Sequence, residues 1–114
     1  MHELSIALSI VDIAADTVKK NGGGQVEAIY LKLGALSGVV KDALLFCWEI
    51  ACADSPVQGS RLVIEDVPLV VYCSDCSARS TLESINQLVC PVCKNPTPVI
   101  ENGRELELTS LEIL

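Results

Sequence analysis

The chain of 114 residues has few basic residues, with 8 Lys and Arg against 15 Asp and Glu, and its net charge is −7. Binding to a nucleic-acid backbone depends on positive charge that neutralises phosphates, so this balance argues against a nucleic-acid partner. The sequence also lacks the long apolar run of a membrane span, and the acidic opening Met1-His2-Glu3 does not begin a signal peptide. We therefore expect a soluble, cytoplasmic protein that contacts neither nucleic acid nor a membrane.

Motifs for catalysis are missing as well. The sequence holds no nucleophile–base pair, and Gly22-Gly23-Gly24 lacks the lysine and the spacing of a phosphate-binding loop. We therefore expect no enzymatic activity. The length suits about one compact domain together with a small module that is cross-linked by a metal ion. Hydrophobic residues make up 50% of the chain and charged residues 20%, a surplus that favours apolar surface for a partner or for a homodimer.

The sequence does contain two Cys-x-x-Cys pairs, Cys73 with Cys76 and Cys90 with Cys93, and thirteen residues lie between the pairs. Each pair forms a tight turn that directs both sulfurs the same way, so four thiolates can converge on one ion. Zinc is the expected metal because it suits four sulfur ligands in a tetrahedron. Four cysteines leave no open coordination position, so the zinc would be structural.

Other interpretations of these cysteines stay open at this point. They could form two disulfides or one redox-active pair, although a redox pair normally opens a long helix and residues 77–81 have the pattern of a strand or turn. Iron bound by the same ligands would make a rubredoxin-like electron carrier, and the protein would be red. Cys47 and Cys52 lack ligand spacing and lie in an apolar segment, so we expect small buried hydrophobic residues there.

Residues 4–20 have the apolar periodicity of a helix, but the pattern covers most of its circumference. One stripe begins at Leu4 and Leu8, and a second consists of Ile6, Ile10 and Ile13. Such a helix must be covered on two sides, either completely within its own domain or partly by a partner protein. Docking of a partner on the second stripe would bring it beside the N-terminus.

The remaining pattern alternates strands and one further helix. Residues 26–33, 61–65 and 69–72 are expected to be extended, and the helix at 41–53 is apolar enough to be expected in the core. Asn102-Gly103 predicts a hairpin or turn before a last strand at 104–114. A bulge near Thr109-Ser110 is expected to keep four apolar residues of that strand on the core side: Leu106, Leu108, Leu111 and Ile113. The chain would thus leave the core, build the zinc module and return.

The N-terminus has the groups for a second metal site. The free α-amine, the amide nitrogen of His2 and the imidazole of His2 can close two adjacent chelate rings around one ion. Amide nitrogens bind a metal only after losing a proton, which favours square-planar Ni(II) or Cu(II) over zinc. Glu3 could complete the plane through its amide nitrogen or add a carboxylate. The site requires that Met1 is retained, and a bulky second residue generally protects it.

Four features in one order carry a specific resemblance: Met1-His2-Glu3 at the start of a helix, the segment Leu31–Val39, the two Cys-x-x-Cys pairs and Gly103-Arg104-Glu105-Leu106. Together they resemble the HypA/HybF family of hydrogenase-maturation nickel metallochaperones, over essentially the whole chain. In one respect the chain departs from some family members, which recruit further histidines from the zinc module. Here His2 is the only histidine, so any further nickel ligand must come from another group, a partner or water.

The resemblance implies an α+β fold, with a small mixed sheet packed by two helices and an inserted four-cysteine zinc module. Residues 1–70 and 99–114 would form the nickel-binding core, and residues 71–98 the zinc module. Met1, His2 and Glu3 would bind nickel as transient cargo. A HypB-like nickel-delivery GTPase and the precursor of the hydrogenase large subunit would be the partners. The alternative is a zinc-ribbon interaction or nucleic-acid-binding module without a nickel role.

Overall fold

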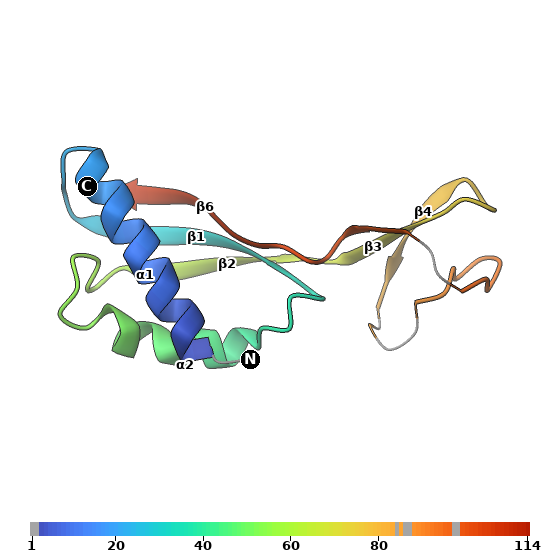
Figure 1. Cartoon of the computed structure of the whole chain (residues 1–114), viewed down its shortest axis with the longest axis horizontal. Helices are drawn as coiled ribbons and strands as arrows, with labels where there is room; N and C mark the ends of the chain where they lie inside the picture. The colour runs from blue at the N-terminus through green and yellow to red at the C-terminus, as the bar shows by residue number, and fades with distance from the viewer. Residues whose placement is uncertain (1–2, 84, 86–87, 97–98) are drawn as a thin grey trace. The chain divides into compact units, whose positions relative to one another are not determined.

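The computed structural model describes residues 3–83, 85, 88–96 and 99–114 (Figure 1). Two helices and six strands follow one another in the order α1 (Glu3–Lys20), β1 (Val26–Gly34), α2 (Lys41–Cys52), β2 (Arg61–Val67), β3 (Leu69–Cys73), β4 (Ala78–Leu82), β5 (Val99–Asn102) and β6 (Leu106–Ile113). The strands form two three-stranded sheets, in the orders β2-β1-β6 and β4-β3-β5. The expected α+β class is confirmed, with two helices, small sheets and a four-cysteine insertion.

The chain divides into two compact units. The first consists of the chain up to Lys32, Val39–Glu65 and Glu107–Leu114, and the second of Leu33–Gly38 and Asp66–Leu106. The sequence prediction placed the boundaries of the insertion at residues 71 and 98. In this division the second unit also includes the strand ends that lead into and out of the cysteine loops.

Helix α1 carries complementary charges at its two ends, with Glu3 in the first turn and Lys19 and Lys20 in the last. These charges oppose the partial charges of the helix dipole. The helix ends where the N–H of Gly23 donates to the carbonyl of Val18 at 2.9 Å, with Gly23 at φ 86°. Glycine adopts this left-handed conformation without the cost that a Cβ atom would impose, so the predicted stop at the glycine run is confirmed.

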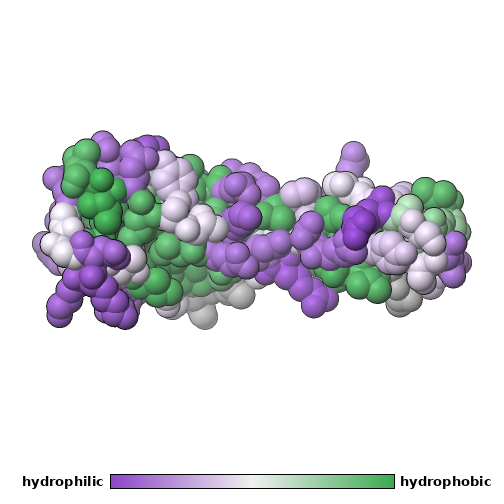
Figure 2. Space-filling view, turned by 90° about the horizontal axis from the view of Figure 1, so that it is seen from above, coloured by the Kyte–Doolittle hydropathy of each residue, from purple (hydrophilic) through white to green (hydrophobic). Residues whose placement is uncertain are grey.

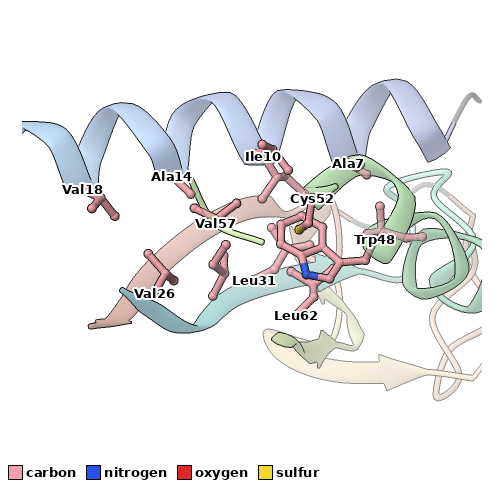
Figure 3. Packing of buried hydrophobic residues seen from close by; sticks show 14 residues of the cluster. Ala7, Ile10, Ala14, Val18, Val26, Leu31, Trp48, Cys52, Val57 and Leu62 are labelled. Carbon is pink, nitrogen blue, oxygen red and sulfur yellow. The ribbon is translucent and has the colours of Figure 1, made fainter. Parts of the chain in front are cut away.

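The core of the first unit lies between the two helices and the sheet β2-β1-β6 (Figure 3). The labelled side chains of α1, from Ala7 to Val18, point toward those of β1 and α2. Trp48 of α2 is the largest residue of this core, and its indole N–H donates to the carbonyl of Ser60 at 3.0 Å. Because this polar atom has a partner, the indole is buried without an unpaired donor. Cys52 lies in the same core and is buried, as predicted, whereas Cys47 is only partly buried against it, on a helix that packs on one side.

Both helices expose more apolar surface than complete burial would allow, and Figure 2 shows hydrophobic residues at the surface among hydrophilic ones. In α1, Ile10 is buried, but Ile13 of the same stripe is 54% exposed. The expectation of a helix α2 wholly in the core is wrong, because Phe46 is 76% exposed and Ile50 is 60% exposed. The helix packs on one side only, through four buried residues: Leu44, Trp48, Ala51 and Cys52.

In the second unit, strand β3 is the centre of an antiparallel sheet. It pairs with β4 from Leu69↔Leu82 to Cys73↔Ala78, and with β5 through Val71↔Ile100 and Tyr72↔Val99. Leu69 and Val71 are buried, whereas β4 and β5 hold no fully buried side chain among the described residues. This sheet therefore has little apolar core of its own.

The segment that begins at Gly34 is bonded to two other segments of the second unit. The Gly34 N–H donates to the carbonyl of Glu105 at 2.7 Å, that of Ala35 to Val67 at 3.0 Å and that of Leu36 to Gly103 at 2.6 Å. A Cβ atom on Gly34 would lie 2.2 Å from the Gly103 carbonyl oxygen. Only glycine permits this approach of two backbones.

The chain returns to the first sheet through β6, as expected. Asn102-Gly103 does not form a hairpin, because Asn102 ends β5, which pairs with β3, whereas β6 belongs to the sheet of β1. Gly103 instead forms a bend at φ 125°. Leu108 and Leu111 pack against the core cluster. The expectation that Leu106 and Ile113 also face the core is wrong: they are 41% and 38% exposed, since β6 is an edge strand.

Candidate metal sites

The four cysteines of the two pairs come from three parts of the second unit. Cys73 ends strand β3, and Cys76 lies in the turn that leads to β4. Cys90 and Cys93 lie in the loop between β4 and β5. The structure brings all four together, with each ligand sulfur within 4.8 Å of the others.

The distances between these sulfurs fit a tetrahedral ion. With Zn–S bonds of about 2.3 Å, tetrahedral geometry separates two sulfurs by about 3.8 Å. The Sγ atoms of Cys73 and Cys93 lie 3.6 Å apart, and those of Cys76 and Cys90 lie 3.8 Å apart. A disulfide would require about 2.05 Å, and all six cysteines of the chain are free. In this structure the donor set fits one metal ion and excludes the two-disulfide interpretation.

The backbone of each pair ends in the same conformation. Ser77 follows the first pair with φ 51°, and Lys94 follows the second with φ 63°. Residues with a Cβ atom seldom adopt this left-handed region, which costs roughly 1–2 kcal/mol. The Lys94 N–H donates to the Cys90 carbonyl at 2.9 Å, which closes the second turn. Both turns thus contain a residue in the left-handed conformation. We explain it by the geometry of the turn, which must direct both cysteine sulfurs of a pair toward the same point.

Charge in the cluster is distributed unevenly among the thiols. Hydrogen bonding with the Cys93 thiol and burial raise the pKa of Cys76 to about 12. Backbone N–H groups of Cys93 and Val92 lower the pKa of Cys90 to about 6. Four thiolates this close repel one another, so they cannot all ionise without a cation among them. A divalent metal supplies that charge, which is a further fit between the donor set and zinc.

A side-chain contact ties the two cysteine loops together. The Asn95 amide donates to the Asp75 carboxylate at 2.6 Å. Asp75 lies between the first two cysteines, and Asn95 comes shortly after the last. Nothing in the spacing of these residues indicates the contact, because it joins loops that are distant in sequence and meet only when the cysteines converge.

The predicted nickel ligands lie at the other end of the chain. Met1 and His2 lie outside the described residues, so the structure gives no geometry for them. Glu3 is described, and its carboxylate accepts a hydrogen bond from the backbone N–H of Val40 at 3.3 Å. Val40 is the N-cap residue of α2, where the helix dipole favours a negative charge. The Glu3 carboxylate is therefore engaged at the start of α2, a role that sequence reasoning missed.

Known proteins are similar to this chain over nearly its whole length. Residues 1–113 match the family model "Hydrogenase/urease nickel incorporation, metallochaperone, hypA". The chain is 49% identical to the hydrogenase maturation factor HypA of Chloroflexus aurantiacus, over 98% of both chains, and 46% identical to that of Chloroflexus aggregans, again over 98% of both. The solution structure of the Ni metallochaperone HypA from Helicobacter pylori superposes with a TM-score of 0.69 at 29% identity, covering 100% of this chain and 98% of that one.

Neither α1 nor α2, the helices of the described chain, is both long enough and apolar enough to cross a bilayer.

Proposed function

Since this chain belongs to the HypA family of nickel metallochaperones for hydrogenase and urease, we propose that it binds Ni(II) at its N-terminus and delivers the ion for the maturation of a [NiFe]-hydrogenase. The family consists of maturation factors rather than enzymes, so the protein carries metal and catalyses no reaction of its own. The observation that carries the proposal is the match of the family over residues 1–113, which includes the N-terminal chelating tripeptide.

The proposed nickel ligands are the α-amine of Met1, the amide nitrogen and imidazole of His2, and a group of Glu3. The contact between the Glu3 carboxylate and the Val40 N–H supports the amide nitrogen of Glu3 as the ligand, because the carboxylate already has a partner. Four nitrogen donors in a plane suit square-planar Ni(II). Each amide nitrogen must lose a proton before it binds, so nickel uptake releases protons.

The proposed zinc ligands are Cys73, Cys76, Cys90 and Cys93. When bound, zinc would act as a structural cross-link, since its four positions are filled and none remains for water. The chain itself contributes the turns that aim the sulfurs and the contact of Asp75 with Asn95. Besides the cysteines, the described part of the second unit buries three apolar side chains, those of Leu33, Leu69 and Val71. With so small an apolar core, the second unit depends on the metal for its order.

The proposed partners are a HypB-like GTPase that assists nickel delivery and the large-subunit precursor that receives the ion, both in the cytoplasm. A contact through helix α1 remains part of this proposal. Its second apolar stripe is not wholly buried, because Ile13 is 54% exposed.

Nickel delivery can be tested in cells that lack this gene. Wild-type protein should restore hydrogenase activity at low external nickel, whereas His2→Ala should not. Surplus nickel in the medium should restore activity in both strains if delivery is the missing step. Rescue by His2→Ala at low nickel, with expression equal to wild type, would contradict the proposal and favour a zinc-ribbon interaction module without a nickel role.

A further inference from the structure

One side of α2 faces away from the core of the first unit. We call it the α2 outer face, and its members are Asp42, Leu45, Phe46, Glu49 and Ile50. They recur at steps of three and four residues, so their side chains are neighbours on the helix surface. Phe46 is 76% exposed, Ile50 60% and Leu45 40%. None of these three belongs to the core cluster, and none is among the partly buried side chains that pack against it.

The fold of the first unit does not require these apolar side chains. Helix α2 is anchored by its opposite side, where Leu44 and Trp48 are buried. An isolated exposed leucine is ordinary at a protein surface, but a phenylalanine with two aliphatic neighbours on one helical face is typical of an interaction site. Phe46 is also the only phenylalanine of the chain. The chain exposes it rather than using it in the core.

The acidic members of the face define what can cover it. Asp42 lies four residues before Phe46 and Glu49 three residues after it, so each carboxylate is one turn from the aromatic ring. Within the described residues, neither carboxylate takes part in an ion pair. A partner that buries Phe46 must come close to both negative charges. Lysine or arginine side chains beside its apolar anchors would compensate them.

A second copy of this chain fits the face poorly. Two such faces would bring their carboxylates together, and each chain carries a net charge of −7. The apolar area is also small: Phe46 exposes on the order of 150 Å², and even with Ile50 and Leu45 the face falls well short of the about 800 Å² that each partner of a standard interface buries. An area of this size suits one aromatic anchor for a short amphipathic segment.

We propose that the α2 outer face docks an amphipathic helix of a partner protein whose apolar anchors lie between basic residues. The choice of candidate partners rests on the proposed function. They are the nickel-delivery GTPase and the hydrogenase large-subunit precursor, and the face would serve as a contact separate from Ile13 on α1.

Two substitutions test the apolar and the acidic parts of the face. Phe46→Ser removes the anchor, and Leu114→Ser is its control, because Leu114 is equally exposed at 77%. Glu49→Lys reverses one charge of the face, and Glu27→Lys, at an exposed position of β1, is its control with the same change in net charge. The affinity of each full-length variant is measured by calorimetry for the purified GTPase and, separately, for the purified precursor.

Phe46→Ser and Glu49→Lys should each weaken binding to at least one partner by about tenfold or more, and the two controls should leave it unchanged. Unchanged affinity for both partners would overturn the proposal. If Phe46→Ser lost binding but Glu49→Lys had no effect, the partner would not depend on the acidic residues of the face, and this result would overturn the proposal of a basic helix. A wild-type dimer in sedimentation that Phe46→Ser dissociates would assign the face to a second copy and would also overturn it.

The same variants distinguish this proposal from the proposed function. All of them should bind nickel as the wild type does, because the face shares no residue with the N-terminal tripeptide. Failure of the wild-type protein to bind nickel would contradict the proposed function, and the partner affinities would still test the α2 outer face.

Discussion

Gly34→Ala tests how the second unit is held together. The substitution places a Cβ atom 2.2 Å from the Gly103 carbonyl oxygen and 2.6 Å from the Glu105 amide nitrogen, both backbone atoms that cannot turn away. The two strand segments must therefore separate. Overpacking of this kind costs roughly 1–3 kcal/mol. Weakening the hydrogen bonds that Gly34 and Leu36 donate adds about 1 kcal/mol. We expect a loss of about 2–4 kcal/mol in the free energy of unfolding.

The control for this variant is Gly59→Ala. Gly59 has φ 86° and open space around the added Cβ atom. The variant should therefore lose roughly 1–2 kcal/mol of stability from the unfavourable backbone conformation alone, without any clash. Gly34 does not have a positive φ, so its cost comes from the clash alone. The two variants thus separate steric from conformational effects.

Hydrogen exchange of the zinc-loaded protein measures the expected loss where it occurs. The amides of Gly34, Ala35 and Leu36 should exchange roughly 30- to 1,000-fold faster in Gly34→Ala, the ratio that corresponds to about 2–4 kcal/mol. Trp48 fluorescence should report an intact first unit. Equal protection of these amides in Gly34→Ala and wild type would refute the close backbone approach.

Three further predictions concern the metal module and the partner surface. Cys73→Ala or Cys90→Ala should release zinc and loosen the loops around it while the helical core persists, and a variant that keeps one tightly bound zinc would contradict the four-cysteine site. Lys94→Gly should stabilise the module by about 0.5–1 kcal/mol in thermal melting, because glycine adopts φ 63° without the steric cost of a Cβ atom. The control Ser80→Gly, in β4, should destabilise the module. If Lys94→Gly were instead the less stable of the two variants, backbone strain at the second turn would be excluded. Ile13→Glu should weaken pull-down of the GTPase or the precursor at normal zinc content, and an unchanged yield would remove α1 from the partner surface.

Local patterns were sufficient to predict most of the secondary structure. The periodicity of residues 4–20 and the glycines that follow predict α1 and its end, because both signals depend on neighbours in sequence. The convergence of four cysteines was predictable for a related reason, since a Cys-x-x-Cys pair fixes its own turn geometry. Neither prediction needed knowledge of long-range packing.

Features that depend on what covers an element were not predictable in the same way. The sequence of α2 is apolar on both sides. Asp42 and Glu49 mark the side that holds Phe46 and Ile50, but the pattern does not show that no other element of the fold covers these two side chains. The contact of Glu3 with Val40 joins residues 37 positions apart and requires the two helix starts to meet. The exposure of Leu106 follows from the position of β6 at a sheet edge, which is a property of strand order.

Nickel titration of untagged protein by calorimetry tests the central claim most directly. An α-amine and an imidazole ordinarily titrate near pH ~8 and ~6.5, and only their unprotonated forms bind a metal ion. Wild-type protein should therefore bind one nickel ion with an affinity that falls steeply from about pH 7.5 to about pH 6. His2→Ala and an N-terminally tagged form should lose the site while zinc content stays normal. Equal nickel affinity in all three proteins would contradict binding at the N-terminus and remove the main support for a nickel carrier.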